Sequence, residues 1–187
     1  MVQVRLRGFL AFRERRKIMK ETTFWKDLKS GKFAQMVVKE SRGKYLTKPR
    51  DVYNVVKPLF AENDDVETVY CIFLDIKNRM LAIEKVFTGS ISSAVIYPRE
   101  IVKRVIALKA NGVIMVHNHP SENPEPSLDD KSITKKTLMA LATIDVKLLD
   151  HIIIGNGYHS LADEGWIASL TDEFNTLLST QKGGDVK

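Results

Sequence analysis

Residues 113–130 combine metal-ligand side chains at a spacing that would bring them together. His117 and His119 stand two residues apart at the end of an apolar run, and Asp130 follows after a proline-rich stretch. Because residues i and i+2 of a β-strand project from the same face, a strand ending here would present both imidazoles together. Two histidines and one carboxylate, with a position open for water, form a catalytic zinc site, whereas structural zinc sites are closed by four protein ligands. The segment therefore predicts a metal-dependent hydrolase with Zn²⁺ held by His117, His119 and Asp130.

Hydrolysis at such a centre requires two further groups. Zinc lowers the pKa of water from about 15.7 towards 7, and a nearby glutamate must take the released proton and return it to the leaving group. A hydrogen-bond donor should stabilise the oxyanion of the tetrahedral intermediate. The hydroxyl of Ser127, three residues before Asp130, could be that donor.

The same residues also allow purely structural interpretations. Ser127 and Asp130, spaced three apart at the start of a predicted helix, match a capping box, in which both side chains satisfy free backbone amides. Capping and catalysis are compatible, because the helix N-terminus would help to hold the geometry of the site. His151 lies within an apolar run and is expected to be a hydrogen-bonded core residue rather than a fourth ligand. Cys71, the only cysteine, is expected to be an inert core thiol.

Length and composition place the chain among globular proteins. Its 187 residues suffice for one domain with an extension, and an apolar content of 44% argues against wholesale disorder. No apolar run approaches the roughly 20 residues needed to span a bilayer. Charged residues 13–17 stand where a secretory signal would be apolar. These observations predict a cytoplasmic protein with no membrane partner.

The positive charge is concentrated at the N-terminus. Residues 1–50 carry 15 Lys and Arg against 4 Asp and Glu, whereas the remaining residues carry 14 against 19. We therefore expect a basic extension at 1–47 that could be flexible, a domain at 48–180 and a frayed terminus at 181–187. The extension could contact nucleic acid non-specifically, bind an acidic partner, or be a solvated tail. Met19 is an alternative translation start.

Apolar periodicity predicts alternating strands and helices, and hence an α/β fold with a mixed central sheet. A hairpin is expected because two apolar stretches flank a short polar link. The predicted helices cover residues 51–62, 98–110, 127–143 and 164–178, and the predicted strands cover residues 67–75, 79–87, 113–116, 146–154 and 158–161.

The motif His-x-His-Pro, followed after six residues by Ser and after two more by Asp, resembles the signature of the JAMM metallopeptidases, the catalytic branch of the MPN/JAB domains. Bacterial RadC-like proteins, which have been labelled DNA repair proteins, are more similar still. Three segments resemble RadC landmarks in the right order, namely YPRE at 97–100, HNHPS at 117–121 and LDHIIIG at 149–155. The resemblance extends from about Leu46 to Ile167. It implies a zinc-binding MPN fold with His117, His119 and Asp130 as ligands and Ser127 as the oxyanion-stabilising residue.

The resemblance also indicates where the catalytic glutamate lies. In JAMM enzymes this residue begins an apolar strand well upstream of the histidines, and Glu67 matches that position. Glu84, in the middle of the next predicted strand, is the competitor, with the structural alternative of an exposed residue paired with a cation. Glu67 is the favoured general acid/base.

Two features depart from the RadC pattern. Residues 1–50 lack the Gly-rich helix-hairpin-helix pattern of full-length RadC proteins, so DNA binding through that module is not carried over. Glu122 stands where RadC proteins usually have Gly, and its charge could narrow access to the metal or alter substrate preference.

The sequence thus predicts a zinc metallopeptidase that cleaves a peptide or isopeptide bond of an unknown protein or peptide substrate through a zinc-activated water. The ligand set alone would equally permit other hydrolyses. The alternative is a non-catalytic MPN scaffold or DNA-associated module that uses the basic extension.

Overall fold

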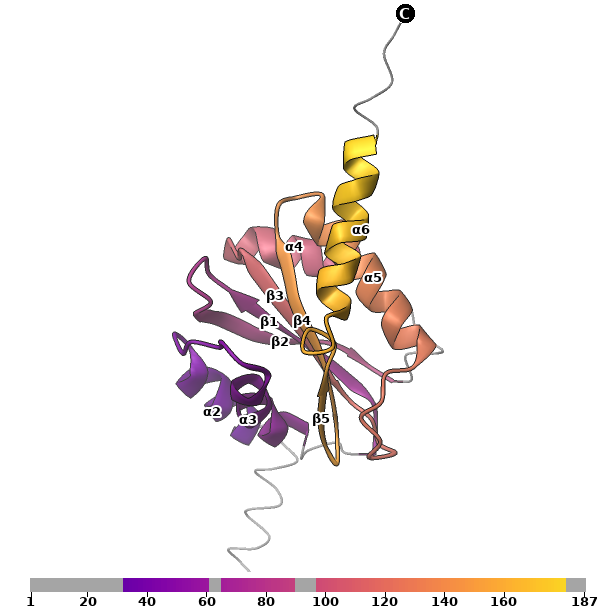
Figure 1. Ribbon diagram of the computed structural model, residues 1–187. Helices are drawn as coiled ribbons and strands as arrows, with labels where there is room; N and C mark the ends of the chain where they lie inside the picture. The colour runs from indigo at the N-terminus through magenta and orange to yellow at the C-terminus, as the bar shows by residue number, and fades with distance from the viewer. Residues whose placement is uncertain (1–31, 61–64, 90–96, 181–187) are drawn as a thin grey trace, which may run out of the picture.

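The computed structural model describes residues 32–60, 65–89 and 97–180 (Figure 1). Its elements in chain order are α2 (Lys32–Ser41), α3 (Pro49–Phe60), β1 (Thr68–Leu74), β2 (Met80–Thr88), α4 (Pro98–Leu108), β3 (Gly112–Asn118), α5 (Leu128–Ala142), β4 (Lys147–Gly155), β5 (Gly157–Ser160) and α6 (Trp166–Thr180). The expected α/β fold with a mixed sheet flanked by helices is confirmed.

The five strands of the described sheet are arranged in the order β2-β1-β3-β4-β5. Strands β1 and β2 form the predicted antiparallel hairpin, and β1 also pairs antiparallel with β3. Strands β3 and β4 are parallel, which requires a crossover, and α5 makes it. The crossover places the N-terminus of α5 near the end of β3, where the two histidines lie.

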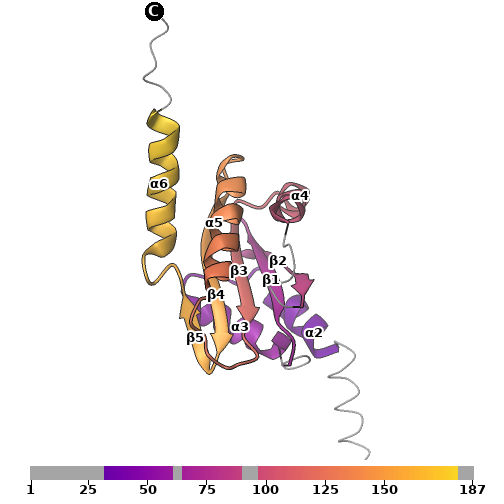
Figure 2. The same cartoon turned by 90° about the vertical axis from the view of Figure 1, so that its right-hand side faces the viewer.

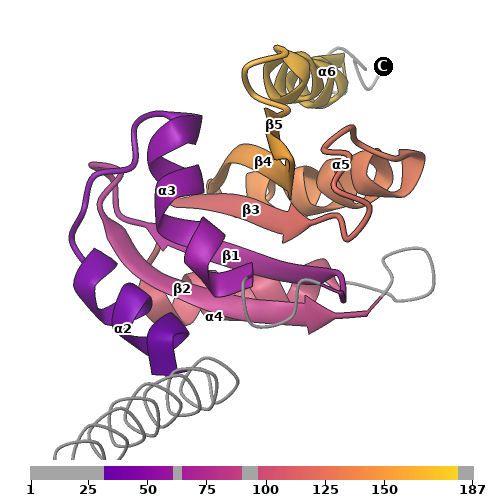
Figure 3. The same ribbon diagram turned by 90° about the horizontal axis from the view of Figure 1, so that it is seen from below.

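Helices cover both faces of the sheet (Figure 3). Residues of β1 alternate between the faces: Cys71 and Phe73 pack in the cluster that contains residues of α4, α5 and α6, whereas Ile72 packs in the cluster that contains residues of α3. His117 has the same parity along β3 as Met115, which belongs to the α4/α5/α6 cluster. The alternation therefore assigns the metal-ligand candidate His117 to the face beneath α5.

Both faces carry buried apolar cores. Phe73 and Leu141 are fully buried on the α5 face, and Val56 and Ile152 are fully buried on the α3 face. Each such side chain contributes about 1.5–3 kcal/mol through burial of apolar surface. The site thus lies at the ends of strands whose sheet is packed on both faces.

Two differences from the predicted elements concern the core and the site, beside shifts of one or two residues at helix ends. Helix α2 was not predicted, yet Val37 and Val38 pack against the core on the α3 face. Strand β3 extends to Asn118, two residues further than predicted, so His117 lies within the strand. The frayed terminus predicted at 181–187, like residues 1–31 of the basic extension, lies outside the described residues.

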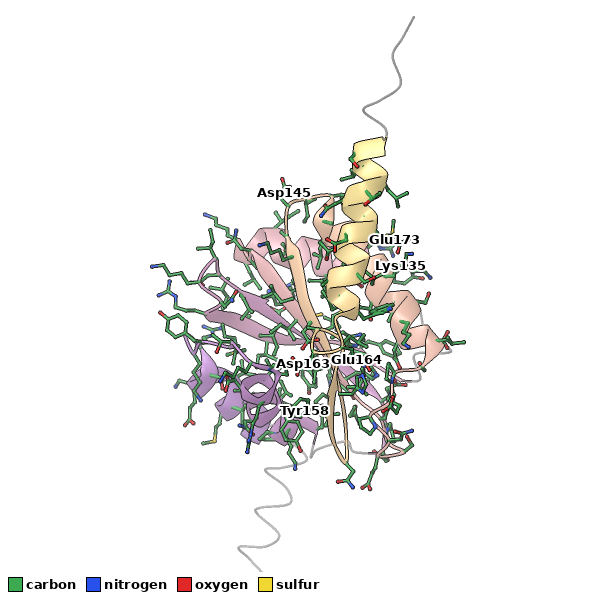
Figure 4. All side chains as sticks on the ribbon, viewed as in Figure 1. Lys135, Asp145, Tyr158, Asp163, Glu164 and Glu173 are labelled. Atoms are coloured by element: carbon green, nitrogen blue, oxygen red, sulfur yellow. The ribbon has the colours of Figure 1, made fainter. Side chains whose placement is uncertain are left out.

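Helix α6 packs beside α5 and continues beyond the end of the sheet (Figure 2). Figure 4 shows Lys135 of α5 next to Glu173 of α6, and Lys135 Nζ lies 2.7 Å from Glu173 Oε1. An exposed ion pair of this kind contributes about 0–1 kcal/mol, so the apolar contacts dominate the attachment. Within the described ranges, no helix has the length and apolar character required to cross a membrane.

Candidate metal centre

Four side chains converge at the end of β3. Glu67, His117, His119 and Asp130 each offer one ligand atom, and these atoms all lie within 4.8 Å of one another. Nε2 of His117 lies 2.9 Å from Nε2 of His119 and 3.1 Å from Oδ1 of Asp130, while Nε2 of His119 lies 3.3 Å from Oδ2 of Asp130. Three separate elements of the fold, the start of β1, the end of β3 and the first turn of α5, therefore supply one cluster.

The pairing of β1 with β3 brings Glu67 into this cluster. Val69 stands opposite His117 in the antiparallel register, and continuing that register by two residues sets Glu67 opposite His119. The carboxylate Oε1 of Glu67 lies 3.7 Å from Nε2 of His117. Of the two glutamates considered from the sequence, Glu67 is thus the one that the structure brings to the histidines.

Asn118, between the two histidines, holds the backbone on both sides of Glu67. Its side-chain Oδ1 accepts a 2.8 Å hydrogen bond from the backbone N–H of Thr68, and its Nδ2 donates a 3.2 Å hydrogen bond to the carbonyl of Val66. Asn118 is buried. Sequence reasoning missed this contact, because it joins residues about 50 positions apart through the β1–β3 register.

Glu84 lies elsewhere on the sheet. It pairs with Cys71 across the hairpin, and its Oε2 accepts a 2.6 Å hydrogen bond from Nε of Arg104 on α4. It is therefore the cation-paired strand residue that was its structural alternative. The thiol of Cys71 is fully buried, and burial raises its pKa to about 12, as expected for an inert core cysteine.

The first turn of α5 carries Asp130 on a complete capping box. Oγ of Ser127 accepts a hydrogen bond from the Asp130 backbone N–H, and Oδ2 of Asp130 accepts a 2.8 Å hydrogen bond from the Ser127 backbone N–H. The Ser127 hydroxyl also donates to Oδ2 at 2.6 Å. Ser127 therefore lies at the site, and its hydroxyl proton is directed at the carboxylate of Asp130.

The loop after β3 orients His119. Its Nδ1 lies 2.7 Å from the backbone carbonyl of Asn123, which can only accept, so Nδ1 carries the proton. In the neutral ring Nε2 then presents a lone pair towards Asp130. The loop is tied to β4, since Ile154 accepts from the backbone N–H of His119, and Glu122 accepts from that of Asn156.

The electrostatics of the cluster favour a cation. Burial alone would raise the pKa of the Asp130 carboxyl, but the adjacent His117 and His119 hold it well below its usual range. The Asp130 carboxylate in turn raises the pKa of His119, more strongly than burial lowers it. Oδ1 of Asp130 is buried and has no hydrogen-bond partner among the described residues. A divalent ion between Oδ1 and the imidazoles would satisfy it, so this donor set fits zinc.

His151 is buried directly behind the cluster, as expected for a core histidine. Its Nε2 lies 2.8 Å from Nδ1 of His117, and its Nδ1 lies 2.6 Å from Oγ1 of Thr134 on α5. Burial lowers the pKa of His151 well below its ordinary value, and the adjacent His117 lowers it further. The ring is therefore neutral and contacts a metal-ligand candidate instead of joining the ligand set.

An open groove of about 750 Å³ borders the cluster at His119. Its walls include Lys57 and Phe60 from α3, His119 and Glu122 from the loop after β3, and Ile154 from β4. Glu122 adopts a left-handed backbone conformation with φ of 61°, which disfavours residues other than Gly by about 1–2 kcal/mol. The charged side chain that departs from the RadC pattern thus lines the approach to His119.

Comparison with known proteins assigns the chain to a family. The model of the RadC-like JAB domain matches residues 46–166. A UPF0758 protein of Xanthomonas campestris pv. campestris (strain 8004) is 44% identical over 128 residues, which cover 67% of this chain and 56% of that protein. One from Stutzerimonas stutzeri (strain A1501) is 43% identical over 127 residues, with the same coverage. One from Xanthomonas oryzae pv. oryzae (strain PXO99A) is 48% identical over 102 residues, which cover 54% of this chain and 45% of that protein.

The chain spans about half the length of these curated relatives. The matched region contains Glu67, both histidines of the cluster, Ser127 and Asp130. The predicted resemblance is therefore confirmed, and the chain belongs to the RadC-like JAB-domain family.

Proposed function

We propose that this chain is a zinc-dependent hydrolase that cleaves a peptide or isopeptide bond. The observation that carries the proposal is the convergence of Glu67, His117, His119 and Asp130 within 4.8 Å, beside an open groove that His119 lines. Two histidines and a carboxylate match the ligand set of catalytic zinc sites that keep a position open. The JAB-domain family to which the chain belongs includes metallohydrolases, which supports the same assignment.

His117, His119 and Asp130 would hold the ion. Bound zinc supplies Lewis-acid chemistry, polarising a substrate carbonyl and lowering the pKa of water. Glu67 lies beside the ligands, with 16% of its side chain exposed, so solvent and substrate can reach its carboxylate. We assign it the transfer of a proton from the attacking water to the leaving amine.

Ser127 is the proposed donor to the substrate oxyanion. Its hydroxyl now donates to Oδ2 of Asp130, and a substrate oxygen would compete for that proton. Ligation of a cation by Asp130 would weaken the carboxylate as an acceptor, which favours release of the hydroxyl. Oγ of Ser127 can continue to accept from the Asp130 backbone N–H while its proton turns to the substrate, so capping and catalysis are compatible.

The test compares Glu67→Gln with Glu84→Gln as its matched control. Wild-type protein loaded with zinc is incubated with a diverse peptide library and with lysine-linked isopeptide conjugates, and new termini are detected by mass spectrometry. We expect cleavage that chelation abolishes. Glu67→Gln should retain zinc but lose turnover by about 10²–10⁴-fold, the usual contribution of general acid–base catalysis.

Glu84→Gln is an equally conservative substitution, but the carboxylate that it removes bonds Arg104 and does not face the cluster. It should cleave at close to the wild-type rate. A Glu67→Gln protein that turns over substrate as fast as wild type would contradict the assignment of the acid/base residue.

The alternative function, a non-catalytic scaffold that contacts DNA, rests on the 15 Lys and Arg within residues 1–50. It predicts salt-dependent DNA binding that weakens when residues 1–31, which carry nine of these 15 side chains, are deleted, together with no cleavage of any amide substrate. DNA binding that is already absent at low salt would remove this alternative.

A further inference from the structure

A chain of buried polar groups runs from His117 away from the metal centre. Nδ1 of His117 contacts Nε2 of His151 at 2.8 Å, and Nδ1 of His151 contacts Oγ1 of Thr134 at 2.6 Å. The Thr134 hydroxyl also contacts the backbone carbonyl of Asp130, one turn earlier on α5. All three side chains are fully buried, so protein groups, not bulk water, set the position of each proton.

Donor and acceptor capacities fix the direction of this chain. The Asp130 carbonyl can only accept, so the single hydroxyl proton of Thr134 is donated to it. Oγ1 of Thr134 must then accept from His151, which places a proton on Nδ1 of His151. A neutral His151 therefore has a bare Nε2, which accepts from Nδ1–H of His117.

The outcome at His117 is a single tautomer. With its proton on Nδ1, a neutral His117 presents a bare Nε2 to Asp130 and His119, the orientation that a metal ligand needs.

The fold brings together the residues of this hydrogen-bond relay, which runs from His117 through His151 and Thr134 to the Asp130 carbonyl. Met115 stands opposite His151 in the parallel pairing of β3 with β4, so His117 and His151 occupy diagonal positions on neighbouring strands. Both lie on the sheet face covered by α5, which contributes Thr134 and Asp130. The chain of hydrogen bonds thus begins at one proposed ligand and ends on the backbone of another.

We propose that Thr134 and His151 are positioning residues that set the tautomer of His117 and thereby raise the affinity of the centre for a divalent cation. This inference rests on the proposed metal site but does not depend on what the site hydrolyses. Outer partners of metal-bound histidines act in this way in general, since they fix the ring and raise its basicity.

A neighbouring residue provides a matched control. Thr137, three residues further along α5, is also fully buried, and its hydroxyl has no hydrogen-bond partner within the described parts of the chain. Thr134→Val and Thr137→Val therefore delete the same atom from the same helix at equal burial. Only Thr134→Val breaks the relay, whereas Thr134→Ser preserves the hydroxyl.

The experiment measures zinc affinity by competition with a chromophoric chelator, using the full chain. We expect Thr134→Val to weaken binding by about 10–100-fold, the usual effect of removing an outer partner of a metal ligand. Thr134→Ser and Thr137→Val should bind within about threefold of wild type. Thermal unfolding of each variant is recorded in parallel, because a purely structural role for Thr134 would lower stability and leave affinity unchanged.

A second readout is the tautomer itself. Nitrogen-15 NMR of the metal-free wild type, recorded at a pH at which the spectrum itself shows a neutral His117 ring, should show that ring protonated at Nδ1. In Thr134→Val the Nε2–H form should become populated. If that variant does not fold, the wild-type spectrum alone decides, since a His117 protonated at Nε2 overturns the proposal.

Unchanged zinc affinity in a folded Thr134→Val protein would also overturn the relay. The proposed hydrolytic function is tested separately. A wild type that binds zinc but cleaves no amide would contradict that function, and the zinc affinity of Thr134→Val would still decide whether the relay exists. A wild type that binds no zinc overturns both.

Discussion

At the scale of single residues, three consecutive side chains divide the tasks of the proposed centre. His117 and His119 face Asp130, and Asn118 between them bonds the backbone on both sides of Glu67. One tripeptide thus supplies two of the three proposed ligands and fixes the backbone on both sides of the proposed acid/base residue. Asn118 acts through Glu67 and contacts none of the proposed ligand atoms in the described structure.

Asn118→Ala separates these tasks. We expect zinc affinity to stay within about threefold of wild type, because the three proposed ligands remain. The turnover number should fall by about 10–100-fold with little change in KM, since a small displacement of a catalytic group carries a cost of this size. Steady-state kinetics beside chelator competition would measure both. A variant that loses zinc as completely as His119→Ala would contradict the assigned role.

At the scale of elements, the end of β4 supports the loop that orients His119. A Cβ added at Gly155 would lie 2.4 Å from the carbonyl oxygen of Glu122, so only glycine allows this approach. The next residue, Asn156, donates its backbone N–H to the same carbonyl at 2.7 Å. Asn123, whose carbonyl orients His119, follows Glu122 in the sequence. The contact of β4 with Glu122 therefore affects the position of the proposed ligand His119 through two loop residues.

Gly155→Ala should therefore displace this loop. We expect the free energy of unfolding to fall by about 1–3 kcal/mol, the usual cost of overpacking, and zinc affinity to fall with it. Asn156→Ala is the control, because it alters an exposed side chain and keeps the backbone hydrogen bond. Thermal unfolding and chelator competition would report both effects. A Gly155→Ala protein with wild-type stability would show that the close approach has no energetic weight.

The predictable and unpredictable parts of the site also separate at this scale. The strand that leads to His117 and the helix that Ser127 caps followed from apolar periodicity and the capping pattern. The contacts of Asn118 with Val66 and Thr68, and of His151 with His117, depend on strand register across 34 to 52 residues. Local pattern carries no information on register at that range. The parity of His151 along β4 was the available clue, since it matches that of Ile153 in the α5-face core.

Helix α2 could not be predicted for a different reason, which is that its charge was considered and its apolar spacing was not. Its segment was assigned to the basic extension on charge, and its apolar residues Val37 and Val38 were not weighed as a helical face. Charge composition describes how a segment meets solvent and partners, but apolar spacing decides whether it docks. Residues 32–41 do both, because the helix packs against α3 while presenting exposed Lys39.

At the scale of the whole molecule, the matched domain and the charge distribution point to different partners. Residues 46–166 match the RadC-like JAB domain and contain the proposed catalytic groups, whereas the positive charge is concentrated in residues 1–50. The chain also spans about half the length of its curated relatives. Contact of the basic segment with nucleic acid remains a prediction that is separate from hydrolysis.

The central claim concerns the metal centre, and the most direct test is the metal content of the purified wild type beside His119→Ala, measured by mass spectrometry after reconstitution with zinc. Circular dichroism would show that both proteins are folded. We predict about one zinc per chain in the wild type and loss of the metal in the variant, because His119 is one of only three proposed protein ligands. A folded wild type that retains no zinc, or a His119→Ala variant that retains as much as wild type, would contradict the proposed site.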